Sequence, residues 1–249
     1  MDVGEFANEI SFRFYGVDTE FDSRRFQYYR LKALLGHVGV SLEALNTRLP
    51  EEGRELRRRL GPLLSVPRWS TFAMGAIINK AVRTMPPDTV FLNIGVYYGF
   101  TLFTGMAGNA NRRSIGVDNF SEFEGRAPGG PRETFLKHFE RIKGPHDEFF
   151  ELDYREYFER SHHGAPLGFY IYDGPHAYEH QLHGLQLAEP YLVSGGLILV
   201  DDTNWDDPRR ATIDFMAEHR GKYELLADRG TVKNQHPTFW NGLMLLRRR

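Results

Sequence analysis

The stretch FYIYDGPHAYEHQLHGLQLAEPYLVSGGLILVDD, residues 169–202, has the order strand, turn, helix, turn, strand. Its two strands, Phe169–Tyr172 and Gly196–Val200, are short and apolar, which is typical of strands buried on both faces of a sheet. Ligands of a parallel α/β sheet bind beyond the carboxyl ends of the strands. We therefore expect one crevice to collect the three acidic residues that follow these strands: Asp173, Asp201 and Asp202.

Three carboxylates in a partly desolvated crevice repel one another strongly. Because Mg²⁺ and Ca²⁺ prefer carboxylate oxygens, we interpret Asp173, Asp201 and Asp202 as ligands of Mg²⁺ or another divalent cation. The alternative is that Asp201 and Asp202 only cap the next helix. The repetition of strand, acid and turn in sequence order favours the metal.

The length, composition and charge of the whole chain limit its domain organisation and its partners. It has 249 residues, 41% of them hydrophobic, with a net charge of −2 and no cysteine. We predict an N-terminal helical extension over residues 1–66 and one α/β domain over residues 67–249. The charge does not suggest a nucleic-acid partner, and the lack of cysteine excludes disulfides and thiolate ligands.

No stretch has the pattern of a signal peptide or of a membrane span, so we expect a cytoplasmic protein that does not bind a membrane. In the extension, residues 11–15 could form a short strand or an extended arm. Residues 23–36, 41–49 and 50–64 have the spacing of helices. Amphipathic helices of this kind pack on their own domain or on a second copy, so we expect a homo-oligomer.

Residues 89–94, TVFLNI, form a clear buried strand that leads into a glycine-rich turn at Gly95 and Gly99. Glycine lacks Cβ, which lets the backbone of such a turn approach a ligand closely. The dinucleotide fingerprint needs a third glycine between these two, and it is missing here. Packing alone would explain about half of such turns, but this one follows the first strong strand of the α/β region.

Two further strands end in an acidic residue. Residues 114–117 form a strand that Asp118 follows, and residues 148–152 form a strand that ends at Asp153. An acid at the end of the second strand holds ribose hydroxyls in nucleotide-type sites, so Asp118 and Asp153 are candidates to contact a ribose or a base. Both could also be solvated acids at the ends of strands. Helices are expected at 71–83, 132–142, 154–161 and from Pro208, a loop over Gly125–Pro131, and an antiparallel pair of strands at 222–227 and 242–246.

With the glycine turn and the acids together, the chain resembles class I S-adenosylmethionine-dependent methyltransferases. Within them it is similar to the metal-dependent small-molecule O-methyltransferases of the catechol and macrocin type. NIGVYYGFT matches their first motif except at Asn93, where the family has Glu or Asp. YDGPHAYEH and LVSGGLILVDD match their fourth-strand motif and the strand after it. The resemblance covers about residues 71–249.

The resemblance implies a Rossmann-like, seven-stranded, mostly parallel sheet with an antiparallel last strand and helices on both faces. It also implies S-adenosylmethionine as cofactor, and Asn93 could still accept a hydrogen bond from it. The cofactor would contact residues from several strand ends: Asn93, Gly95, Tyr97, Gly99, Thr101, Asp118, Asn119, Asp153 and Asp173. The same resemblance places Mg²⁺ on Asp173, Asp201 and Asp202.

We therefore predict methyl transfer to a hydroxyl of a sugar, a phenol or a natural-product alcohol. His176 occupies the position of the catalytic base in the catechol group, and histidine titrates near neutrality. It could instead cap the following helix, and Asp173 is the alternative base. Three other readings are a nicotinamide-dependent oxidoreductase, a non-catalytic domain of methyltransferase ancestry and a metal-dependent hydrolase.

Overall fold

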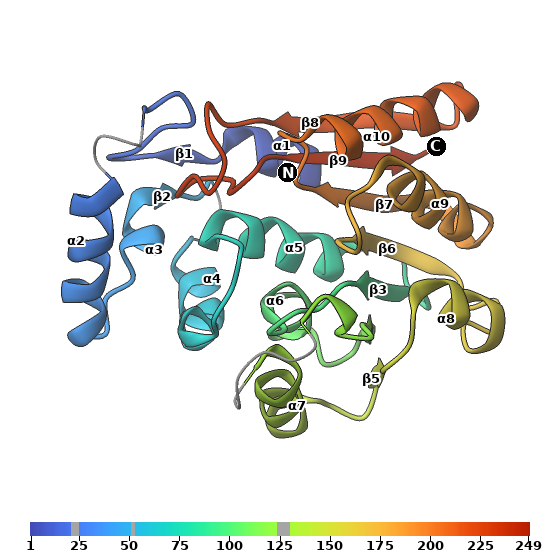
Figure 1. Cartoon of the computed structure of the whole chain (residues 1–249), viewed down its shortest axis with the longest axis horizontal. Coiled ribbons are helices and arrows are strands. Elements are labelled where there is room, and N and C mark those ends of the chain that lie inside the picture. Colours follow the sequence, from blue (N-terminus) through green and yellow to red (C-terminus); the bar gives the residue numbers. More distant parts are fainter. Residues whose placement is uncertain (21–24, 51–52, 124–129) are drawn as a thin grey trace.

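The computed structural model describes residues 1–20, 25–50, 53–123 and 130–249 (Figure 1). Its centre is a sheet with helices packed on both faces. The seven strands of this sheet are β3 (Val90–Ile94), β4 (Arg113–Val117), β5 (Asp147–Phe150), β6 (Leu167–Tyr172), β7 (Leu192–Asp201), β8 (Tyr223–Arg229) and β9 (Leu243–Arg248).

The strands lie in the order β5-β4-β3-β6-β7-β9-β8. β3 pairs in parallel with β4 and β6, and β6 pairs in parallel with β7. β9, the last strand, runs antiparallel to both of its neighbours, β7 and β8. The predicted fold class is therefore confirmed: a Rossmann-like, mostly parallel seven-stranded sheet with an antiparallel last strand.

Each face of the sheet buries its own core because successive side chains of a strand point to opposite faces. Phe91 and Phe169 stack at 5.1 Å on the face covered by α1 (Val3–Glu9), α5 (Phe72–Thr84), α6 (Phe100–Met106) and α7 (Pro131–Ile142). Tyr170 and Ile198 lie on the face covered by α8 (Tyr154–Arg160), α9 (Tyr178–Ala188) and α10 (Asp206–Glu218). Among the helices that the structure describes, none has the length and apolarity to cross a membrane.

Helix α1 was not predicted, although the sequence carries a signal for it. Asp2 accepts the N–H of Glu5, and the Glu5 side chain accepts the N–H of Asp2 in return, which is a capping box. Val3 and Phe6 of this helix are buried in the same core as α5. The N-terminus is therefore packed against the main sheet.

Three predicted N-terminal elements form with shifted bounds: β1 (Ser11–Phe12), α2 (Arg25–His37) and α3 (Leu42–Asn46). The last part of the helix expected at 41–49 instead forms a short strand, β2 (Thr47–Arg48). The single helix expected at 50–64 is wrong. It is α4 (Gly53–Leu60) followed by a 3-10 helix, Gly61–Ser65, because Pro62 cannot continue the α-helical hydrogen bonds. The start of the helix expected at 23–36, residues 51–52 and most of the loop expected at 125–131 lie outside the described residues.

His162 gives the fold an expected pH dependence. Its side chain is 2% exposed, and burial lowers its pKa from 6.5 to about 4. His162 is therefore protonated below about pH 6.5 in the unfolded chain, but only below about pH 4 in the folded protein. The free energy of unfolding should fall by up to about 3 kcal/mol as the pH drops through this window. Urea unfolding at a series of pH values measures it.

The matched comparison is His162→Gln against His146→Gln, because His146 is exposed. We expect the first variant to flatten the pH dependence and the second to leave it unchanged. Equal slopes in all three proteins would show that His162 does not carry it.

Candidate active site

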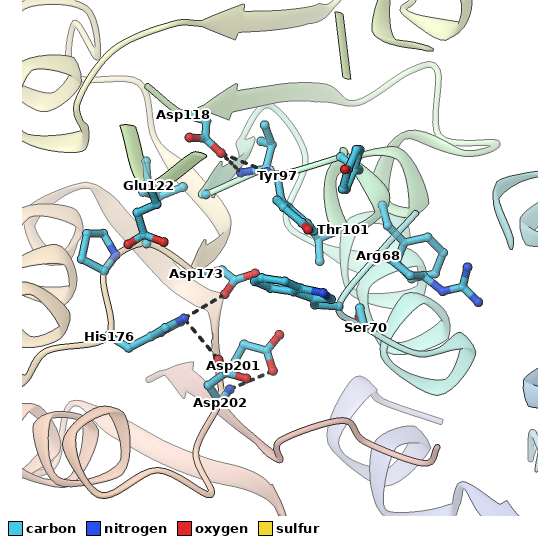
Figure 2. Close-up of a pocket in the computed structure, with 18 of the residues that line it drawn as sticks. Arg68, Ser70, Tyr97, Thr101, Asp118, Glu122, Asp173, His176, Asp201 and Asp202 are labelled. Carbon is cyan, nitrogen blue, oxygen red and sulfur yellow. Dashed lines mark hydrogen bonds and ion pairs between the residues drawn. The ribbon is translucent and has the colours of Figure 1, made fainter. Parts of the chain in front are cut away.

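A cavity of about 730 Å³ opens at the carboxyl ends of the parallel strands. Residues at or just beyond the ends of five strands line it: Ile94, Val117, Leu152, Asp173 and Asp201. Figure 2 shows Asp118, Tyr97, Asp173, His176 and Asp202 around this cavity. The volume lies within the range of small-molecule sites, so the predicted location of the crevice is confirmed by the fold.

Backbone conformation and close packing require glycine at both positions of the turn after β3, Gly95 and Gly99. Gly95 has φ +77°, and a Cβ there would overlap the backbone carbonyl oxygen of Asp173. Gly99 has φ +98° and does not line the cavity, and a Cβ there would overlap the ring of Phe103. Packing between the ends of β3 and β6 and beneath α6 thus requires glycine at both positions, and Gly95 also lines the cavity, so its contact with a ligand stays a prediction.

Asp118 holds the glycine turn in place (Figure 2). Its Oδ2 accepts the backbone N–H groups of Val96 and Tyr97, each at 2.9 Å, and its Oδ1 accepts that of Phe120 at 2.7 Å. Burial raises the pKa of this carboxyl, and the three N–H donors oppose that rise. A carboxylate has about four acceptor positions, so roughly one remains for a ligand.

Most other residues of the predicted cofactor site line the cavity, and Asn93 does not. Tyr97, Thr101, Asn119 and Asp153 line it. Asp153 also caps α8 and forms an ion pair with a flanking arginine. Asn93 does not line the cavity: it is fully buried, and its Nδ2 donates to the carbonyl oxygens of Ile94 and Gly95. Its side chain lies within the protein at the end of β3, so the contact with a cofactor expected for Asn93 stays a prediction.

Three side chains come together at the opposite side of the cavity: Asp173, His176 and Asp202. Each offers one ligand atom within 4.8 Å of the others. His176 Nε2 lies 3.2 Å from Asp202 Oδ2 and 3.9 Å from Asp173 Oδ1 (Figure 2). His176 also stands edge-to-face on Trp205 at 5.0 Å. The spacing suits one divalent ion on the two carboxylates, with the imidazole either as a third ligand or beside the ion as a base.

Asp201 does not belong to this group, which differs from the predicted set of three aspartates. It is still part of β7 and is 3% exposed, and its Oδ1 accepts the N–H of Asp202 at 2.8 Å. Asp202 turns away from the strand with φ +57°. Consecutive residues at a strand end thus point in different directions, and His176 takes the place expected for Asp201 in the cluster.

The carboxyl groups of this end are costly to ionise together. Burial raises the pKa of Asp173 well above its usual range, and Asp201 and Asp202 raise it further. Burial also raises the pKa of Asp201, with Asp202 adding to the effect. For Asp202 burial again raises the pKa, while His176 opposes the rise. A bound cation would relieve this repulsion. The carboxyl groups at this end of the cavity therefore suit a divalent cation.

Two distant parts of the chain also line the cavity and were not predicted as site residues. The N-terminal segment contributes Lys32, Arg68 and Trp69, and the segment between β8 and β9 contributes Gln235, Trp240 and Asn241. With Trp205, all three tryptophans of the chain line it. Trp69 lies 4.7 Å from the ring of Tyr97. No local motif marks these residues, because they reach the site only through the fold.

The sheet order, with its antiparallel last strand and a cavity at the strand ends, defines a Rossmann-like methyltransferase fold. Residues 92–203 match the family model described as a methyltransferase domain. The match confirms the resemblance to class I methyltransferases that the motifs indicate. It spans the glycine turn, Asp118 and the cluster at Asp173. A comparison with curated proteins found no match.

Solved structures share the fold over most of the chain. The TDP-rhamnose 3'-O-methyltransferase CalS11 of calicheamicin biosynthesis is 22% identical, with a TM-score of 0.54, over 92% of this chain and 95% of that one. A protein from Corynebacterium glutamicum is 13% identical, with a TM-score of 0.54, over 90% and 97%. The O-methyltransferase NovP is 17% identical, with a TM-score of 0.52, over 69% and 77%. At these identities the likeness is one of fold.

Proposed function

We propose that the protein transfers a methyl group from S-adenosylmethionine to a hydroxyl of a small molecule, assisted by a divalent metal. The observation that carries the proposal is the joining of two sites in one cavity. The turn fixed by Asp118 lies on one side, and the cluster of Asp173, His176 and Asp202 lies on the other. A donor site and an acceptor site must share a cavity for the transfer to occur.

The charge of the cavity suits a cationic donor. Among the residues that the structure describes, six carboxyl groups line it, whereas the lysine and arginine side chains that line it, Lys32 and Arg68, are both paired with the buried Glu43. S-adenosylmethionine, when bound, supplies a methyl group on a positively charged sulfonium. Asp118 would present its remaining acceptor position to the ribose, with Asn119 and Asp153 beside it. Tyr97 and Thr101 would border the methionine part.

Asp173 and Asp202 would hold the divalent ion, with His176 beside them and the charge of Asp201 behind. When bound, such an ion would lower the pKa of a coordinated hydroxyl, as metals do for water. His176 Nε2 is the group placed to accept the hydroxyl proton, because it faces the space between the two carboxylates. Asp173 is the second candidate for this role.

The acceptor would lie against the aromatic wall. Trp69, Trp205 and Trp240 offer flat apolar faces, which suit a sugar ring or a phenol. CalS11 is named for methylation of a rhamnose, and its shared fold supports the inclusion of sugars among the acceptors to be tested. The homo-oligomer and the lack of a nucleic-acid partner, both expected from the sequence, stay predictions.

The test combines donor binding with metal removal. We expect calorimetry to detect binding of S-adenosylmethionine, and mass spectrometry to detect a deuterated methyl group on a hydroxyl of a sugar, phenol or natural-product alcohol. EDTA should abolish the transfer, and Mg²⁺ should restore it. Turnover that survives EDTA would remove the metal from the proposal. Failure to bind the donor at all would favour the non-catalytic reading, and binding of NADH instead would favour the oxidoreductase.

A further inference from the structure

Asn241 lies directly against Asp202 in the cluster. Its Nδ2 donates to Asp202 Oδ1 at 2.8 Å, and the contact is buried, because Asn241 is 4% exposed and Asp202 7%. The other oxygen of the carboxylate, Oδ2, is the one that lies 3.2 Å from His176. The two oxygens of Asp202 therefore have separate partners, and the bond to Asn241 determines where the second oxygen points.

The amide of Asn241 is itself fixed in one orientation. Its Oδ1 accepts the backbone N–H of Gln235 at 2.6 Å, and its backbone carbonyl accepts the N–H of Asn204 at 2.7 Å. A flipped amide would turn its oxygen toward the Asp202 carboxylate and its NH₂ toward the Gln235 N–H, so both contacts would become repulsive. Asn241 can thus donate to Asp202 in one arrangement.

The segment that carries Asn241, residues 230–242 between β8 and β9, is in turn held by the N-terminal part of the chain. Val232 donates its N–H to the carbonyl of Val17 at 3.1 Å. The Thr71 hydroxyl donates to the carbonyl of Thr238 at 2.5 Å. This anchoring gives Asn241 a fixed position at the end of a long connection, which a carboxylate orienter requires.

We propose that Asn241 is a positioning residue that orients the Asp202 carboxylate for a divalent ion. The inference rests on the proposed function, since it assumes a metal at the cluster of Asp173, His176 and Asp202. Residues that orient a metal ligand through a hydrogen bond change metal affinity by about 10- to 100-fold when they are lost. We expect a loss of that size from Asn241.

The experiment measures Mn²⁺ binding by electron paramagnetic resonance in wild type, Asn241→Leu and Asn241→Ser. Leucine keeps the approximate volume without a donor, and the serine hydroxyl is too short to reach Asp202. The control is Asn234→Ser, which lies in the same segment but is exposed and bonds Asn204 rather than Asp202. S-adenosylhomocysteine affinity and thermal midpoint are measured in parallel as tests of folding.

We expect Mn²⁺ binding to weaken by about 10- to 100-fold in both Asn241 variants and by less than twofold in the control, with unchanged S-adenosylhomocysteine affinity. Should the leucine variant fail to fold, the serine variant decides. Mn²⁺ affinity within twofold of wild type in a folded Asn241 variant would overturn the inference and leave the proposed function intact. Absence of Mn²⁺ binding by the wild type would instead overturn the metal in the proposed function, and this inference with it.

Discussion

Asp173→Ala should lower kcat by about 10³-fold or more and should remove detectable Mn²⁺ binding. Asp173 is one of the three residues that could share an ion, and it is also the second candidate for the base. General bases contribute about 10²- to 10⁴-fold, and a metal adds several kcal/mol of charge stabilisation. Turnover is measured with an acceptor identified by the mass-spectrometric test, and Mn²⁺ binding by electron paramagnetic resonance.

Comparison of Asp173→Ala with metal removal by EDTA tests whether Asp173 acts through the metal. If Asp173 acts through the metal, EDTA should lower wild-type turnover to a level close to that of the variant, and it should add little to the variant itself, because the two changes remove the same element. Asp207→Ala is the control, since the Asp207 side chain is 48% exposed and forms a surface ion pair with Arg210. A variant that keeps a tenth of wild-type turnover and stays sensitive to EDTA would contradict the proposed role of Asp173.

S-adenosylhomocysteine binding separates a lost metal from a lost fold. Asp173 lies at the edge of the donor region, so we expect its affinity in Asp173→Ala to stay within about tenfold of wild type, a difference of about 1.4 kcal/mol. Asp118 and the glycine turn are independent of the Asp173 carboxylate in their hydrogen bonds. Loss of both donor and metal binding would point to disruption of the turn rather than of the cluster.

The sheet and the position of its cavity could be predicted because the signals are local. Buried strands appear in the sequence as short apolar runs. Their ends are marked by acidic residues: Asp118, Asp173 and Asp201. The chain topology then brings those ends to one edge without any further information. The capping box at Asp2 and Glu5 was equally local, so α1 could have been predicted from the same kind of reasoning.

The direction of each side chain at that edge could not be predicted. Asp201 and Asp202 are neighbours in sequence, but only Asp202 reaches the cluster, because its left-handed backbone ends β7. His176 was expected as a base, and its three-residue spacing from Asp173 also brings it within 3.9 Å of that carboxylate. Such details depend on turn geometry that residue types do not specify.

The walls of the cavity depend on contacts between segments far apart in the chain. Lys32 and Arg68 share the buried carboxylate of Glu43, at 2.5 Å and 2.7 Å. Burial alone would raise the pKa of Glu43, but Arg68 and Lys32 outweigh it and lower the pKa. A charge network of this kind places the N-terminal segment beside the cavity, and no periodicity in the sequence encodes it. The same holds for Asn241, whose partner is 39 residues away.

Gly95→Ala should destabilise the protein by about 2–4 kcal/mol, the other large effect that we expect. A left-handed φ costs alanine about 1 kcal/mol. The added Cβ would also overlap the Asp173 carbonyl oxygen, and that backbone cannot move freely, because the Asp173 N–H donates to the carbonyl of Ile94 at 3.0 Å. Overpacking against a fixed group adds about 1–3 kcal/mol or more. Urea unfolding measures the total.

Gly164→Ala separates these two costs. Gly164 has φ +71°, close to the +77° of Gly95, but a Cβ there would meet no atom within 4 Å. The control should therefore lose only about 1 kcal/mol, the backbone cost alone. Because relief of the overlap must push apart the ends of β3 and β6, folded Gly95→Ala protein should also bind Mn²⁺ more weakly than Gly164→Ala. Equal losses of stability in the two variants would mean that the turn tolerates a side chain, and that the contact with Asp173 does not explain the glycine.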